Sequence, residues 1–245
     1  MQAEKSVLVW DLPTRVFHWS LVVLVLIGWF SGEGEGVAQE IHRYSGEAIV
    51  GLLVFRFIWG FIGGEHARFS SFIASPRDVV THIRELFSFK AERTIGHNPL
   101  GAISSVVLML LVAATAATGL FSASDHGLSG PFAGAFNVNF EEIHEVFFRV
   151  LQAMVLLHLA GVATTSFASR DNLVLAMITG HKQRASDEPA HDAKKAPKTS
   201  LYIAGTLAVV AAAILMTLPH AAAPGEHDAR QENHDYDEHD NDSDH

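Results

Sequence analysis

Five long blocks of apolar residues, each with very few charges, divide the chain, and they run over residues 16–30, 48–62, 100–121, 146–167 and 201–218. A helix that crosses the hydrocarbon layer of a bilayer needs about 20 mostly apolar residues. The first two blocks are shorter than this, but each extends through flanking small, amphipathic or histidine residues. The pattern predicts an all-α integral membrane protein with five spanning helices.

Polar residues mark where several helices begin. Ser75 followed by Pro76 is typical of an N-cap and a first helical position, and apolar residues then recur at helical spacing up to residue 87. We expect a short amphipathic helix on the membrane surface there. Asn139 and Glu142 have the spacing of a capping box at the start of the fourth span.

Lysine and arginine are distributed unevenly between the two sides of the predicted bundle. With the amino end inside, thirteen of the seventeen basic residues lie in inner segments, two lie outside, and Arg56 and Arg149 fall within spans. Because segments kept on the cytoplasmic side are enriched in lysine and arginine, we expect a cytoplasmic amino terminus in a bacterial inner membrane. If the fifth span crosses, residues 219–245 are then periplasmic.

The amino-acid composition limits the kinds of metal and cofactor site that the chain can form. The chain contains no cysteine, which excludes disulfides, thiolate metal sites and covalent c-type haem attachment, whereas it contains 15 histidines. The formal charge of -10 comes mostly from the segment after Leu218, which holds nine acidic residues against Arg230 and is expected to be disordered. No basic patch suggests a nucleic-acid partner.

Four histidines lie within or at the edge of predicted spans, where an ionisable residue is costly and indicates function. His18 lies at the cytoplasmic end of the first span and His42 at the outer end of the second. His144 and His158 lie on one helix, fourteen residues apart, which places them within ~40° of the same face and ~21 Å apart along the axis. His18 and His158 are therefore expected at the same depth near the cytoplasmic side, and His42 and His144 at the same depth near the outer side.

Two depth-matched histidine pairs indicate a cofactor at each level. Two neutral imidazoles on opposite sides of one iron are the usual ligands of a low-spin b-type haem, so the pattern predicts two haem b groups, one in each leaflet. A single interfacial histidine is more often an ordinary hydrogen-bonded residue. The two matched pairs are harder to explain in that way.

Arginines near the histidines offer partners for haem propionates. Arg56 lies deep in the second span, where it either binds a propionate through two parallel hydrogen bonds or reaches to headgroups or a helix end. Arg43, beside His42, and Arg149 are further candidates. His97 precedes Asn98 and Pro99 at the start of the third span, where it either lines a quinone pocket or caps the helix.

Three motifs resemble one family. They are VWDLPTRVFHW at residues 9–19, HRYSG at 42–46 followed by FRFIWG at 55–60, and GHNPLG at 96–101. Together they resemble the bacterial cytochrome b561 and nickel-iron hydrogenase cytochrome b subunit family. The resemblance implies a four-helix, two-haem inner-membrane bundle over about residues 1–180, with His18, His42, His144 and His158 as the iron ligands.

The remainder of the chain departs from that four-helix pattern. We expect a basic cytoplasmic linker at 181–200, a fifth transmembrane helix at 201–218 and an acidic, histidine-rich tail at 219–245. Together, these three additions could serve as a docking device for a partner.

The resemblance implies a transmembrane cytochrome that transfers electrons between the quinone pool, ubiquinone or menaquinone, and a redox partner of the respiratory chain. That partner would be a periplasmic or membrane protein such as a c-type cytochrome or an oxidoreductase subunit. One alternative is a stand-alone quinone-linked oxidoreductase, for example one that oxidises superoxide. A metal-handling membrane protein is a third possibility, because histidines and carboxylates alternate in the tail.

Overall fold

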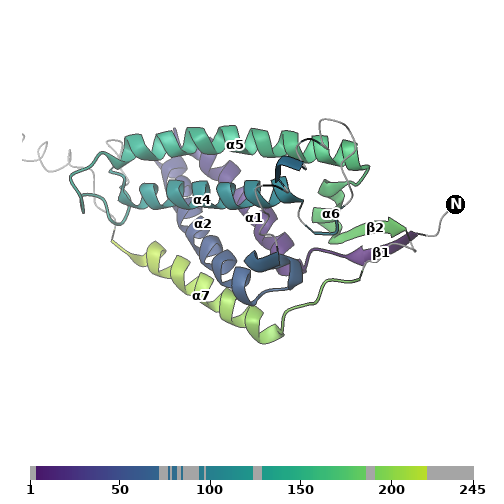
Figure 1. The fold of residues 1–245 in the computed structure, drawn as a ribbon. Helices are drawn as coiled ribbons and strands as arrows, with labels where there is room; N and C mark the ends of the chain where they lie inside the picture. The colour runs from purple at the N-terminus through teal and green to yellow at the C-terminus, as the bar shows by residue number, and fades with distance from the viewer. Residues whose placement is uncertain are drawn as a thin grey trace, which may run out of the picture.

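The fold is an all-helical bundle with a small two-stranded sheet at one end (Figure 1). The computed structural model describes residues 4–71, 77, 79–81, 84, 94–96, 98–123, 129–185 and 191–219. Its long helices are α1 (Leu12–Ser31), α2 (Val37–Ile62), α4 (Pro99–Phe121), α5 (Phe140–Ser169) and α7 (Lys198–Thr217). The shorter elements are β1 (Glu4–Leu8), η1 (Glu65–Ala67), η2 (Phe69–Ser71), α6 (Leu173–Thr179) and β2 (His181–Ala185).

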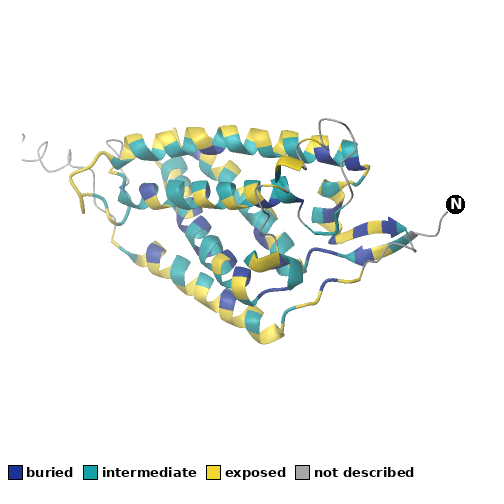
Figure 2. Ribbon diagram, viewed as in Figure 1, coloured by how far each residue is buried: buried dark blue, intermediate teal, exposed yellow. Residues whose placement is uncertain are grey.

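The described residues contain five helices that are long and apolar enough to cross a membrane, which confirms the predicted all-α membrane fold. Large apolar side chains are exposed along them, among them Phe30, Leu156, Phe167 and Val209. Exposed residues follow the outer sides of α5 and α7 (Figure 2). Exposing this much apolar surface to water is unfavourable, so the surface is expected to contact lipid.

Two helix pairs form the bundle. α1 packs along α2, α4 packs along α5, and α2 joins the two pairs through a smaller contact with α4. The core between them contains Ile49 of α2, Val112 of α4 and Leu151 of α5. Leu151 lies seven residues from both His144 and His158, so an apolar layer separates the two histidine levels.

Side-chain caps fix where three of these helices begin. Asp11 accepts a hydrogen bond from the Thr14 amide at the start of α1, and Asn98 accepts one from the Gly101 amide at the start of α4. Asn139 accepts one from the Glu142 amide, so the N-cap predicted for the fourth span is confirmed. Each cap satisfies an amide that has no partner within its own helix.

The strands β1 and β2 pair antiparallel, with Glu4 opposite Ala185 and Leu8 opposite His181. These strands were not predicted from the sequence, and β2 occupies the start of the expected linker. Gly180 makes the turn possible, because its φ is +86° and its carbonyl accepts hydrogen bonds from the amides of Val9 and Trp10. A Cβ atom there would lie 2.7 Å from the Trp10 carbonyl oxygen.

The fifth helix, α7, packs along α2 (Figure 1). Small residues form the contact: Ala204 is fully buried, and Gly51 of α2 lies against Ala208 and Ala212. Small side chains let two helix backbones approach closely in a membrane. The expected amphipathic helix after Ser75 and the tail beyond Pro219 fall mostly or wholly outside the described residues, and both stay predictions.

Candidate haem-binding sites

His42 and His144 face each other across the bundle at one end. Their ring centres lie 6.0 Å apart and their planes are nearly perpendicular, at 86°. His42 lies in the second turn of α2, and His144 lies in the second turn of α5. Because α2 and α5 both begin at this end of the bundle and run in the same direction, these two side chains lie at the same depth.

Backbone carbonyl groups orient both imidazoles of this pair, which is called the outer pair after its depth in the predicted topology. His42 Nδ1 lies 2.8 Å from the Gly28 carbonyl oxygen of α1, and His144 Nδ1 lies 2.8 Å from the Thr115 carbonyl oxygen of α4. A neutral imidazole that donates from Nδ1 presents Nε2 as its free lone pair. The Thr118 hydroxyl also contacts the Thr115 carbonyl oxygen, at 2.9 Å, and His144 Nδ1, at 3.3 Å.

Two glycines leave the room that these rings occupy. A Cβ atom on Gly32 would lie 3.3 Å from His42 Nδ1, and one on Gly119 would lie 3.2 Å from His144 Nδ1. Any larger residue at either position would therefore press on an imidazole. The sequence shows these glycines but not their purpose, because their partners come from a different helix.

His18 and His158 form the pair at the opposite end. They lie close enough for their imidazoles to interact electrostatically. His18 Nδ1 is buried and, within the described part of the chain, has no hydrogen-bond partner. The Trp19 ring contacts His18 edge-on, with 5.1 Å between ring centres.

The arginines differ in their surroundings. Arg56 is 7% exposed, its guanidinium lies 4.9 Å from the Phe69 ring centre, and it interacts electrostatically with Asp11, the N-cap residue of α1. Arg43 forms an ion pair with the buried Glu47, at 3.6 Å.

Arg149 and His97 are the two remaining residues that the sequence indicated as candidates. Arg149 pairs with Glu145, and both side chains are exposed. Asn98 caps α4, whereas His97 lies outside the described residues.

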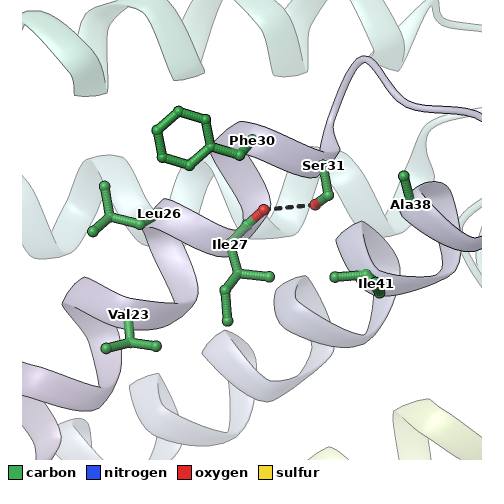
Figure 3. Close-up of a pocket in the computed structure, with 7 residues that line it drawn as sticks. All are labelled: Val23, Leu26, Ile27, Phe30, Ser31, Ala38 and Ile41. Carbon is green, nitrogen blue, oxygen red and sulfur yellow. Dashed lines mark hydrogen bonds between the residues drawn. The ribbon is translucent and has the colours of Figure 1, made fainter.

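An apolar groove of about 430 Å³ lies between α1 and α2 near the outer pair (Figure 3). Among the described residues that line it, Ser31 has the one polar side chain, and its hydroxyl donates to the Ile27 carbonyl oxygen. Its lining residues are Val23, Leu26, Ile27, Phe30, Ser31, Ala38 and Ile41.

The outer pair fits a metal bound between two imidazoles. A metal–nitrogen bond is about 2 Å long, and a ring centre lies roughly 1 Å behind its nitrogen, so two facing rings around one metal have centres about 6 Å apart. The observed 6.0 Å agrees with this value. No group of three or more metal-binding side chains occurs among the described residues. A haem, whose iron accepts two ligands from the protein, would fit between these two imidazoles.

Comparison with known proteins points in the same direction. The sequence model of the family described as prokaryotic cytochrome b561 matches residues 9–180. A probable Ni/Fe-hydrogenase B-type cytochrome subunit from Rhizobium leguminosarum bv. viciae is 26% identical over 214 residues, which is 73% of this chain and 90% of the relative. The probable Ni/Fe-hydrogenase 1 B-type cytochrome subunit of Escherichia coli K12 is 23% identical over 71% of this chain and 89% of its own length.

No solved structure matches the chain significantly. The family match spans α1 to α6, and therefore covers all four histidines and ends before α7. On this match the chain belongs to the prokaryotic cytochrome b561 family and is a multi-pass membrane b-type cytochrome of electron transport.

Proposed function

We propose that this cytochrome carries electrons across the membrane through two haem b groups, one held by His42 and His144 and the other by His18 and His158. The geometry of His42 and His144 carries the proposal, because their ring centres lie 6.0 Å apart and an imidazole that donates from Nδ1 to a carbonyl oxygen would bind iron through Nε2. Haem iron held by two imidazoles gains and loses one electron without a change of ligands.

The spacing of His144 and His158 along α5 sets the distance between the two proposed haem sites. His144 and His158 are fourteen residues apart on one continuous helix, or ~21 Å. Leu151 and its neighbours fill the layer between them and exclude water. Two haem sites at this spacing would relay electrons through the apolar layer, which by itself does not conduct them.

Arg56 is the best candidate for binding a propionate of the inner haem. It is buried in the inner half of α2, and a guanidinium binds a carboxylate through two parallel hydrogen bonds. Arg43 could bind an outer propionate only in competition with Glu47, its present partner.

The partners follow from the relatives and from the family's chemistry. The similar proteins are named as hydrogenase subunits, so we infer a redox enzyme as one partner and ubiquinone or menaquinone as the other. We place the protein in the inner membrane with a cytoplasmic amino terminus. The pairing of β1 with β2 supports this orientation, because it holds Lys5 on the same side as the basic Lys182 and Arg184.

Removing single ligands from the purified protein tests the proposal. We expect two haems per chain, and His18→Ala and His158→Ala should both remove or convert to high spin one spectral component. His42→Ala and His144→Ala should affect the other, because each ligand serves one level of the bundle. A stoichiometry of one haem, or a component shared by His18 and His144, would contradict it.

A further inference from the structure

A second cavity, of about 460 Å³, lies at the end of the bundle where β1 and β2 meet the turn between α5 and α6 (Figure 1). Most of the side chains that line it are polar or charged, unlike those of the apolar groove near the outer pair. Among its lining residues are Arg170, Asp171, Asn172, Leu175, His181 and Lys182.

The charged groups at this cavity do not balance. Lys182 Nζ lies 3.4 Å and Arg184 Nη2 lies 3.0 Å from the same carboxylate oxygen of Asp171. One carboxylate neutralises only one of these two buried cations, so the three side chains together have an excess positive charge. Arg170 adds a further positive charge at the cavity lining, where it is exposed. Among the described residues the balance is therefore positive, which favours an anionic occupant.

The backbone of Arg170 indicates that its side chain matters at this position. The residue follows α5 with φ +53° and ψ +36°, in the left-handed region, and in the described part of the chain it is the one non-glycine residue with a positive φ. Glycine or asparagine is usual at the end of a helix in this conformation, because a Cβ atom makes it less stable. An arginine here accepts that strain and places a guanidinium beside the cavity.

Apolar side chains next to the cavity indicate what kind of anion it takes. Leu175, which lines the cavity, and its neighbours Val174 and Ile178 on α6 are exposed. Arg170 follows the exposed Phe167, the last residue of the fourth apolar block, by only three positions. The cavity therefore lies where the apolar span ends and the lipid headgroups begin. A free anion has no use for apolar neighbours, whereas a lipid has acyl chains that would lie against them.

We propose that this cavity binds the phosphate group of an acidic phospholipid. Arg170 binds the phosphate, since a guanidinium can donate two parallel hydrogen bonds to it. Lys182 and Arg184 supply the surrounding positive charge, and the acyl chains lie along Leu175 and Ile178. The site goes beyond electron transfer and requires no haem at either histidine pair. A zwitterionic lipid contains the same phosphate, but its own cation opposes the charge of the cavity.

Thermal unfolding of the purified full-length protein in lipid nanodiscs tests this proposal. One set of nanodiscs contains phosphatidylcholine alone, and the other contains phosphatidylcholine and phosphatidylglycerol in equal parts. We expect a higher unfolding temperature with phosphatidylglycerol, because a ligand that binds the folded state stabilises it. Arg170→Gly should lose most of this increase. Its unfolding temperature in phosphatidylcholine should stay similar, because glycine adopts a positive φ without strain.

A lipid titration followed by native mass spectrometry compares affinities for phosphatidylglycerol. We expect Arg170→Gly to weaken binding about fivefold, as is typical for the loss of one basic residue at a membrane surface. Lys198→Gln is the matched control, because it removes an exposed cation at the start of α7, outside the cavity lining. Binding by this variant should stay close to that of the unaltered protein.

Three results would overturn the proposal. The unaltered protein could show no preference for phosphatidylglycerol over phosphatidylcholine. Arg170→Gly and Lys198→Gln could weaken binding equally, which would assign the effect to general surface charge and not to the cavity. Inorganic phosphate could displace phosphatidylglycerol from the detergent-solubilised protein, which would make the site one for a free anion. We expect no such displacement, because inorganic phosphate has no acyl chains to contact α6.

Discussion

At the scale of single residues, the least expected feature is a cluster of buried charges where β2 meets the bundle. Lys182 is 4% exposed and Arg184 is 2% exposed, and both reach the Asp171 carboxylate after α5. Both also donate to the Thr94 carbonyl oxygen, just before α4. Burial lowers the pKa of Lys182, and the Asp171 carboxylate opposes that shift.

We expect Asp171→Asn to loosen this end of the molecule, because two buried cations would lose their shared carboxylate. Removing one partner from a buried ion pair typically costs about 3 kcal/mol or more. Faster hydrogen–deuterium exchange in β1 and β2 would report the loss. Asp192→Asn is the control, since an asparagine oxygen can still accept the hydrogen bond from the Leu8 amide. Equal exchange in the two variants would contradict the structural role of Asp171.

At the scale of elements, α7 adds to the four-helix pattern of the family. It lies beyond the family match and covers the face of α2 that contains Gly51. Trp59 of α2 packs in the same contact with Ala204 of α7. The helix is therefore a packed part of the bundle and not a detached anchor.

The close contact at Gly51 predicts a measurable effect of one added methyl group. A Cβ atom there would lie 2.9 Å from Ala212 Cβ and 3.0 Å from the Ala208 carbonyl oxygen. Because this contact must open, Gly51→Ala should cost about 1–3 kcal/mol. Thermal unfolding in detergent or lipid nanodiscs measures the loss.

Gly205→Ala is the control, because its Cβ atom meets open space on α7. The chain has no cysteine, so one introduced pair across α2 and α7 gives a specific cross-link in each variant. Unchanged melting in Gly51→Ala, or no cross-link between the two helices in the otherwise unaltered protein, would show that α7 does not pack on α2 as described.

At the scale of the whole molecule, the orientation in the membrane can be tested directly. We expect reporter fusions within residues 63–96 and at residue 245 to give opposite locations, cytoplasmic and periplasmic. The reason is the excess of basic residues in the predicted inner segments, together with a fifth helix long enough to cross. The same location for both reporters would mean that α7 does not span the membrane.

The acidic tail provides a second prediction at this scale. Deleting residues 221–245 should leave both haems bound, because the four proposed ligands lie on α1, α2 and α5. The haem-to-protein ratio and the reduced optical spectrum check this outcome. Loss of haem from stably inserted, truncated protein would assign the tail a structural role.

The sequence by itself determined the membrane architecture, because a bilayer demands long apolar helices and these are visible as blocks of composition. The helical repeat also determined that His144 and His158 share a face at two depths. Motif resemblance identified the family, which the comparison confirmed.

Only the tertiary structure decided what surrounds the histidines. The acceptors of His42 and His144 are backbone carbonyl groups of Gly28 and Thr115, and every residue has such a group, so no sequence pattern distinguishes them. The same holds for β1 and β2, which pair across more than 170 residues and contain buried cations where an apolar pattern is usual. Local spacing reveals contacts along one helix, whereas contacts between distant segments depend on how the helices pack.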